Sequence, residues 1–188
     1  MDFIDRRTMR TAWGALLHDV GKPPTFAFDE ENNRITFYEH QKVGAEMART
    51  ILSRLRFSNE DTEAIASLVL RHMDFMNVKA MRAGTLRRFL GAPGIDDDLT
   101  LHRADCLGSH GLLDHFEFAK GRLEELRNAP QPIIPKPLLN GHELMASGVK
   151  PGPEVGIVLH DLMEAQLAGD VTTREEALEW FRKRANSA

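Results

Sequence analysis

The sequence predicts an all-α protein, and two observations carry that prediction. Apolar residues recur at steps of three and four along most of the chain, which is the spacing of one face of an α-helix. The short apolar alternation typical of a β-strand occurs in only one stretch, around residue 30. We therefore expect a helical bundle built around one hydrophobic core.

The composition is that of an ordinary globular protein. Of the 188 residues, 42% are hydrophobic and 28% are charged, so disorder is not indicated. The formal net charge of -4 gives nucleic-acid binding no support from bulk charge, although a local basic patch is compatible with it. The single cysteine, Cys106, cannot form an internal disulfide, and no apolar run approaches the ~20 residues of a membrane span. The N-terminal residues lack the pattern of a secretory signal. We expect a cytoplasmic protein.

The first predicted helix covers residues 8–20, where six apolar residues share one face: Met9, Ala12, Trp13, Leu16, Leu17 and Val20. We expect Gly21 to end this helix, because Pro23 and Pro24 follow it directly. The next stretch, FAFDEENNRITF, predicts an extended loop or a small hairpin that turns at Asn32 and Asn33.

Two more helices are predicted over residues 39–56 and from Ser58 onward. His40 lies three residues before Val43, so it shares the inward face of its helix. Ser58 is placed to cap the next helix, with Asp61 in the capping-box position. His72 continues the apolar stripe of that helix.

The second half of the chain predicts further short helices. One covers TLRRFL, and another opens with three aspartates that complement the positive end of a helix dipole and carries Asp105 at a position otherwise typical of the core. A third covers HFEFAKGRLEELRNA. Near the end of the chain, Pro153 is placed to start a helix, and Thr172 or Thr173 to cap another.

This pattern divides the chain into three parts. We predict a main helical domain over residues 1–128, a Pro-rich linker over 129–139 that holds four prolines, and a helical tail over 140–188 that packs on the main domain.

Five polar residues interrupt the apolar stripes of four different helices: His18, Asp19, His40, His72 and Asp105. A buried carboxylate is costly unless it is paired or bound to a metal, and one divalent ion would remove that cost for several groups at once. Each residue alone is more often an ordinary core or ion-paired residue. From the pattern alone, a metal site and a set of unrelated core residues are about equally favoured.

Four strings occur in an order and spacing that resemble a known family: ALLHDVGKP, FYEHQKVGAEMA, LVLRHM and LHRADCLGSHG. They are similar to the HD superfamily of metal-dependent phosphohydrolases. More narrowly, they resemble the HD domain in the C-terminal part of bacterial CCA-adding tRNA nucleotidyltransferases and related poly(A) polymerases. The segment from Leu138 to Trp180 resembles the tail of the same enzymes, so the resemblance covers nearly the whole chain and makes residues 1–128 an HD domain.

The resemblance implies roles for individual residues. His18 and Asp19 match the motif pair, and Asp105 matches the distal aspartate of the metal site. His40 and His72 match the additional histidines that hold a second ion in some members, with Asp19 as the bridge. Among catalytic residues, Asp19 is expected to orient the attacking water, and Lys22 to lie near a substrate phosphate.

The implied activity is phosphomonoester or phosphodiester hydrolysis on a nucleotide or RNA-end phosphate, with a metal-activated water as nucleophile. Mixed nitrogen and oxygen ligands suit one or two ions of manganese, nickel, iron, cobalt or magnesium, and zinc also fits. The expected partners are a nucleotide or phosphate-ester substrate and, as a candidate, tRNA. No membrane is expected, and a homo-oligomer is compatible with the sequence.

Two departures from the family pattern support an alternative. The family's usual histidine ahead of the His-Asp pair has no counterpart in residues 1–17, and no segment resembles the nucleotidyltransferase head, so we expect either a fragment of a longer enzyme or a free-standing HD protein. The alternative function is a non-catalytic tRNA-contacting or oligomerising module with a vestigial metal site, or a fragment whose partner supplies the missing ligand. The second His-Asp pair, His160 and Asp161, matches no ligand position. We expect it to be solvated, and the same ordinary interpretation applies to His102, His110, His115 and His142.

Overall fold

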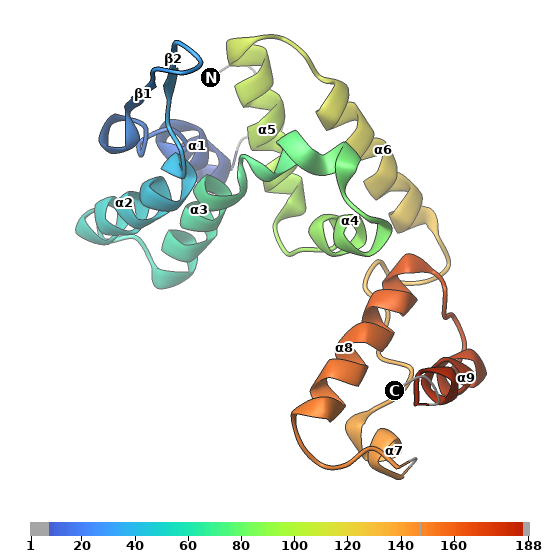
Figure 1. Ribbon diagram of the computed structural model, residues 1–188. Helices are drawn as coiled ribbons and strands as arrows, with labels where there is room; N and C mark the ends of the chain where they lie inside the picture. The colour runs from blue at the N-terminus through green and yellow to red at the C-terminus, as the bar shows by residue number, and fades with distance from the viewer. Residues whose placement is uncertain (1–7, 147, 186–188) are drawn as a thin grey trace. The chain divides into compact units, whose positions relative to one another are not determined.

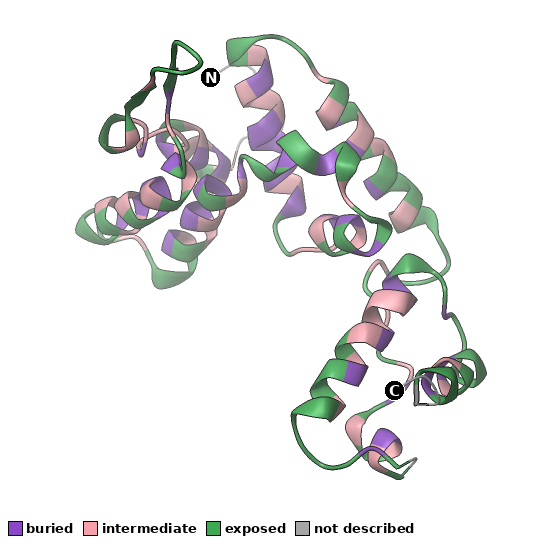
Figure 2. Ribbon diagram, in the orientation of Figure 1, coloured by how far each residue is buried: buried purple, intermediate pink, exposed green. Residues whose placement is uncertain are grey.

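The computed structural model describes residues 8–146 and 148–185, and in this part of the chain it confirms the all-α prediction. The described residues form two compact units (Figure 1). The first comprises the residues up to 79 together with 93–122. The second comprises residues 80–92 and those from 123 onward. Each unit has its own buried core, so the expectation of one hydrophobic core is wrong (Figure 2).

The first unit is a bundle centred on α3 (Asn59–Arg71), which packs against α1 (Met9–Leu17), α2 (His40–Arg54) and α5 (Ile95–Ser109). The first unit also contains the start of α6 (Asp114–Asn128), the 3-10 helix η1 (Pro23–Thr25), nearly all of the 3-10 helix η2 (Asp74–Ala80) and the hairpin described below. One cluster of apolar side chains fills the space between α1, α2 and α3: Leu17, Ala45, Ala48, Leu52, Ile65 and Val69.

Local capping explains where α3 begins. The Oγ of Ser58 accepts a hydrogen bond from the backbone N–H of Asp61 at 3.0 Å, as the sequence predicted. By contrast, α1 ends at Leu17, before the predicted residue 20, and His18 is its C-cap. Gly21 is therefore not the helix terminator. It lies in the turns that follow, where its lack of a side chain has a different use, described below.

The stretch after η1 forms the hairpin that was one of the two predicted outcomes. Strands β1 (Ala27–Asp29) and β2 (Arg34–Thr36) pair antiparallel, with Phe28 opposite Ile35. The turn between them uses Asn33 in the left-handed region, with φ of 49°, a conformation that asparagine tolerates well.

The second unit contains α4 (Ala83–Leu90), α7 (Gly141–Ala146), α8 (Pro153–Ala168) and α9 (Arg174–Ala185). Pro153 occupies the first turn of α8 as predicted. Thr173 is the cap of α9, because its Oγ1 accepts from the backbone N–H of Glu176 at 3.2 Å and the Glu176 carboxylate accepts from the Thr173 N–H at 3.1 Å.

These units divide the chain at different residues from the predicted domains. Residues 80–92 belong to the second unit because α4 packs against α8, where Arg88 forms an ion pair with Glu164. The second division falls inside α6, between Arg122 and Leu123, and not at residue 128. Among the described helices, none is both long enough and apolar enough to cross a membrane.

Candidate metal centre

The five predicted ligand residues all lie in the first unit, and four of them lie at helix ends. His18 is the C-cap of α1, Asp19 follows it in a turn, His40 is the first residue of α2, and His72 is the C-cap of α3. Only Asp105 lies in the interior of a helix, α5. We predicted that these side chains project from inward helix faces. The structure instead places four of them where three helices begin or end.

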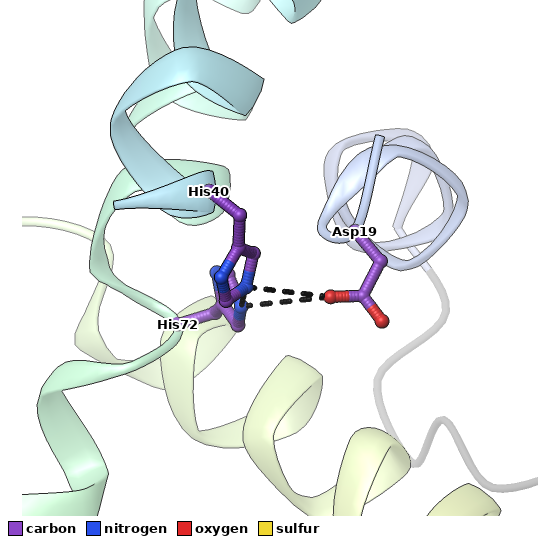
Figure 3. Close-up of side chains that lie close together, drawn as sticks. All are labelled: Asp19, His40 and His72. Carbon is purple, nitrogen blue, oxygen red and sulfur yellow. Dashed lines mark hydrogen bonds and ion pairs between the residues drawn. The ribbon is translucent and has the colours of Figure 1, made fainter. Parts of the chain in front are cut away.

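Asp19, His40 and His72 form a group with metal-ligand spacing. Each offers one ligand atom, and the three atoms lie within 4.8 Å of one another. The Oδ1 of Asp19 lies 3.5 Å from the Nε2 of His40 and 4.0 Å from the Nε2 of His72. Figure 3 shows the carboxylate of Asp19 directed toward the two imidazoles.

His18 and Asp105 extend this group on the other side of Asp19. The Nε2 of His18 lies 3.3 Å from Asp19 Oδ2 and 3.5 Å from Asp105 Oδ1. The two oxygens of Asp19 therefore face different histidines, one toward His40 and His72 and the other toward His18. This is the arrangement that a carboxylate needs in order to bridge two ions.

The three histidines are oriented in the same way. The Nδ1 of each donates to a backbone carbonyl three residues earlier: His18 to Ala15 at 2.9 Å, His40 to Phe37 at 2.9 Å and His72 to Val69 at 2.6 Å. Because a carbonyl oxygen only accepts, each Nδ1 carries a hydrogen, and each Nε2 is left as the ligand atom. Such anchoring fixes the ring of a metal-binding histidine.

The contact between His40 and His72 tests whether a metal fits. Their Nε2 atoms lie 3.1 Å apart, and with both Nδ1 atoms protonated two nitrogen lone pairs face each other. Burial lowers the pKa of His72, and repulsion from the other two histidines acts in the same direction. Two nitrogens bound at about 2.1 Å and at right angles to one ion lie about 3.0 Å apart. The observed spacing fits a shared cation.

On the other side of Asp19, the neighbouring charges shift the pKa values of His18 and Asp105 in opposite directions. Burial by itself lowers the pKa of His18, but the hydrogen bond to Asp105, the carbonyl of Ala15 and the charges of Asp19 and Asp105 together raise it above its usual value. The hydrogen bond from His18 in turn lowers the pKa of Asp105. A cation bound here would compete with a proton for the Nε2 of His18.

The two carboxylates are less buried than the sequence suggested. The side chains of Asp19 and Asp105 are each 37% exposed, whereas His40 and His72 are each only 6% exposed as residues. The acids face a cavity of about 480 Å³ whose wall also includes Lys22. The Nζ of Lys22 lies 2.6 Å from Asp19 Oδ2, which places an ammonium beside the candidate metal ligands.

The other histidines lie apart from this group, with one correction to the expectation. The His160 side chain is 66% exposed and next to Asp161, as expected for a solvated pair. His102 is only 4% exposed, so the ordinary solvated interpretation is wrong for it. Its ring stacks on Phe75 with a centroid distance of 4.4 Å, and burial lowers its pKa to about 4. It faces inward because η2 covers that side of α5.

The pair of Arg71 and Asp98 was missed by the sequence reasoning, which placed Asp98 at the helix dipole. Asp98 is 3% exposed, and its Oδ2 lies 2.8 Å from a guanidinium nitrogen of Arg71. Burial raises the pKa of Asp98 to about 6, although Arg71 acts in the opposite direction. Since Arg71 precedes His72, the pair ties the end of α3 to α5. One feature of the sequence could have indicated that Asp98 is buried: it lies seven residues before Asp105, on the same helix face.

Comparison with known proteins gives a consistent result. A family model described as "HD domain" matches residues 5–108. The chain is 46% identical over 166 residues to the CC-adding tRNA nucleotidyltransferase of Thermus thermophilus, a match that covers 87% of this chain and 37% of that protein. It is 40% identical over 179 residues to the A-adding tRNA nucleotidyltransferase of Deinococcus radiodurans, covering 88% of this chain and 39% of that protein. The chain thus spans about two fifths of the length of these curated relatives.

Proposed function

The chain belongs to the HD domain family, and we propose that it is a cytoplasmic metal-dependent phosphohydrolase that acts on a nucleotide or RNA-end phosphate. The observation that carries the proposal is the 3.1 Å contact between the Nε2 atoms of His40 and His72, with Asp19 alongside. Both Nδ1 atoms donate to backbone carbonyls, so both Nε2 atoms are available as the ligand pair that a divalent cation needs.

The five clustered residues would hold one or two divalent ions. His40 and His72 would bind on one side of Asp19, His18 and Asp105 on the other, with Asp19 as the bridge. A bound ion of this kind supplies a water of lowered pKa and polarises a phosphoryl oxygen. Asp19, which opens onto the cavity, would accept a hydrogen bond from that water and orient it toward the phosphorus.

Lys22 would bind the substrate phosphate. Its Nζ lines the cavity and lies 2.6 Å from Asp19 and 5.7 Å from the ring centre of Phe37. Since its side chain is 40% exposed, it can turn from Asp19 toward an entering phosphate without leaving the site. A positive charge at this position would stabilise the charge that develops on the phosphoryl oxygens.

Hydrolysis of p-nitrophenyl phosphate and bis(p-nitrophenyl) phosphate tests the proposal. The purified chain is stripped of metal and assayed with Mn²⁺, Ni²⁺ or Mg²⁺, alongside the variants Asp19→Asn and His160→Ala. We expect turnover that depends on added metal, that falls at least about a hundredfold in Asp19→Asn, and that is unchanged in His160→Ala. Absence of turnover with every ion would contradict the hydrolase proposal.

A second candidate is a non-catalytic module of a tRNA nucleotidyltransferase, and the comparisons favour it specifically. Both named relatives are tRNA nucleotidyltransferases, and the chain matches about two fifths of each. Filter binding of tRNA over a salt series tests this role, because phosphate contacts give a steep loss of affinity with salt. Binding no tighter than to an unrelated RNA would count against it.

A further inference from the structure

The cavity at the metal centre continues past the candidate ligands to the hairpin. Its wall includes Asp19 and His72 at one end, and at the other it includes Ile35 on β2 and Tyr38 in the segment that leads into α2. One continuous space therefore connects the proposed metal ligands with side chains that have no part in binding metal.

Among the residues that line the cavity, several are apolar or aromatic and exposed. Tyr38 is 68% exposed and Ile35 is 54% exposed, and Met73, which also lines the cavity, is 36% exposed. An apolar cluster of this kind beside polar groups is typical of a ligand-binding site. Tyr38 is also the sole tyrosine of the chain.

Cationic groups line the cavity at both ends. Arg34 and Lys22 both line it. The guanidinium of Arg34 donates to the Tyr38 hydroxyl at 3.3 Å and forms an ion pair with Asp29 at 3.6 Å, while its side chain stays 61% exposed. Because an exposed ion pair contributes little, Arg34 retains the capacity to bind an anion. A ligand that suits this wall has a phosphate and, next to it, a flat apolar ring.

We propose that Tyr38 and Ile35 form a nucleobase subsite, so that the ligand of this cavity is a single nucleoside phosphate with its base on Tyr38 and its phosphate near Lys22 and Arg34. This inference rests on the proposed function for the position of the phosphate. Nucleobases stack on aromatic side chains, and such stacking tolerates any base. A cavity of about 480 Å³ is within the usual range for a small ligand.

The sole tyrosine allows a direct test. The full chain is produced with 3-fluorotyrosine, which gives one fluorine resonance from Tyr38, and is titrated in Mg²⁺ with AMP or with ribose 5-phosphate. We expect AMP to shift the resonance and ribose 5-phosphate, which has no base, to leave it in place. Equal shifts from both ligands, or no shift from AMP, would overturn the subsite. If a 3′-phosphorylated trinucleotide shifts the resonance at a tenfold lower concentration than AMP, the proposal that the ligand is a single nucleotide is overturned.

Variants give a second readout by calorimetry. Tyr38→Ala is expected to weaken AMP binding at least about fivefold and to leave ribose 5-phosphate binding unchanged. Leu112→Ala is the control, because Leu112 is 66% exposed but does not line the cavity. An equal loss in both variants would overturn the role of Tyr38.

The titration needs no turnover, so the two proposals fail separately. A base-dependent shift without any hydrolysis would support the subsite and contradict the hydrolase. Metal-dependent hydrolysis without a base-dependent shift would contradict the subsite alone.

Discussion

Gly21 lies directly against Gly44 of α2, and this backbone contact brings the turn that carries Asp19 up to His40. A methyl group on Gly21 would overlap the carbonyl oxygen of His40 and would lie 2.6 Å from the backbone nitrogen of Gly44. Since the obstacles are backbone atoms, they cannot rotate away. The close approach is therefore part of how the candidate metal centre is assembled.

We predict that Gly21→Ala pushes the Asp19 turn away from α2. Unfolding in urea should show a loss of about 1–3 kcal/mol, and calorimetry should show weaker Ni²⁺ binding. Gly121→Ala is the control, because Gly121 lies in α6 with open space around it, and it should raise the free energy of unfolding by roughly 0.5–1 kcal/mol. Unchanged Ni²⁺ affinity in Gly21→Ala would show that the contact does not position Asp19.

Helix periodicity was enough to predict the all-α fold and the approximate position of most helices. It was weaker at helix ends, which capping and tertiary contacts decide. The Ser58 cap was visible in the sequence because it is local. The role of Gly21 was not, because its neighbour Gly44 lies on another helix.

The candidate site shows the same limit. The sequence identified five residues that the structure brings together, but it placed them on inward helix faces, whereas four of them lie at helix ends. Burial was overestimated for Asp19 and Asp105 and underestimated for His102. The exposure of a side chain depends on which other element covers it, as η2 covers His102, and a single helix does not reveal this.

Removal of one imidazole from the pair of His40 and His72 should weaken metal binding much more than it weakens folding. In His40→Leu we expect the metal-free protein to lose only about 1 kcal/mol, for the hydrogen bond from Nδ1 to the Phe37 carbonyl. Ni²⁺ at a hundred times its dissociation constant should stabilise the wild type by about 2.7 kcal/mol and His40→Leu much less. Thermal unfolding with and without Ni²⁺ measures this. His160→Leu should behave as the wild type, and a full Ni²⁺ response in His40→Leu would contradict the assigned site.

We expect the free energy of unfolding to fall as the pH rises and the carboxyl group of Asp98 ionises. Its pKa in the fold is about 6, above the usual 3.8, so between these values the folded state keeps a proton that the unfolded state releases. The contribution of this group to the free energy of unfolding is therefore fully present below pH 3.8 and is lost as the pH rises to 6. We expect Asp98→Asn to be about 1–3 kcal/mol more stable than the wild type at pH 7 and similar to it at pH 4. A loss of stability in Asp98→Asn at pH 7 would show that the ion pair with Arg71 outweighs burial.

His102 should give the opposite pH dependence. Its pKa in the fold is about 4, below the usual 6.5, because the ring is buried against Phe75. The unfolded state therefore takes up a proton first as the pH falls, and the stability from neutral His102 is full above pH 6.5 and is lost toward pH 4. We expect the wild type to lose about 1.4 kcal/mol per pH unit in this range relative to His102→Leu. Urea unfolding at pH 7, 6 and 5 measures the difference, with His142→Leu, an exposed position, as the control. Parallel pH profiles for the wild type and His102→Leu would show that the fold does not lower the pKa of His102.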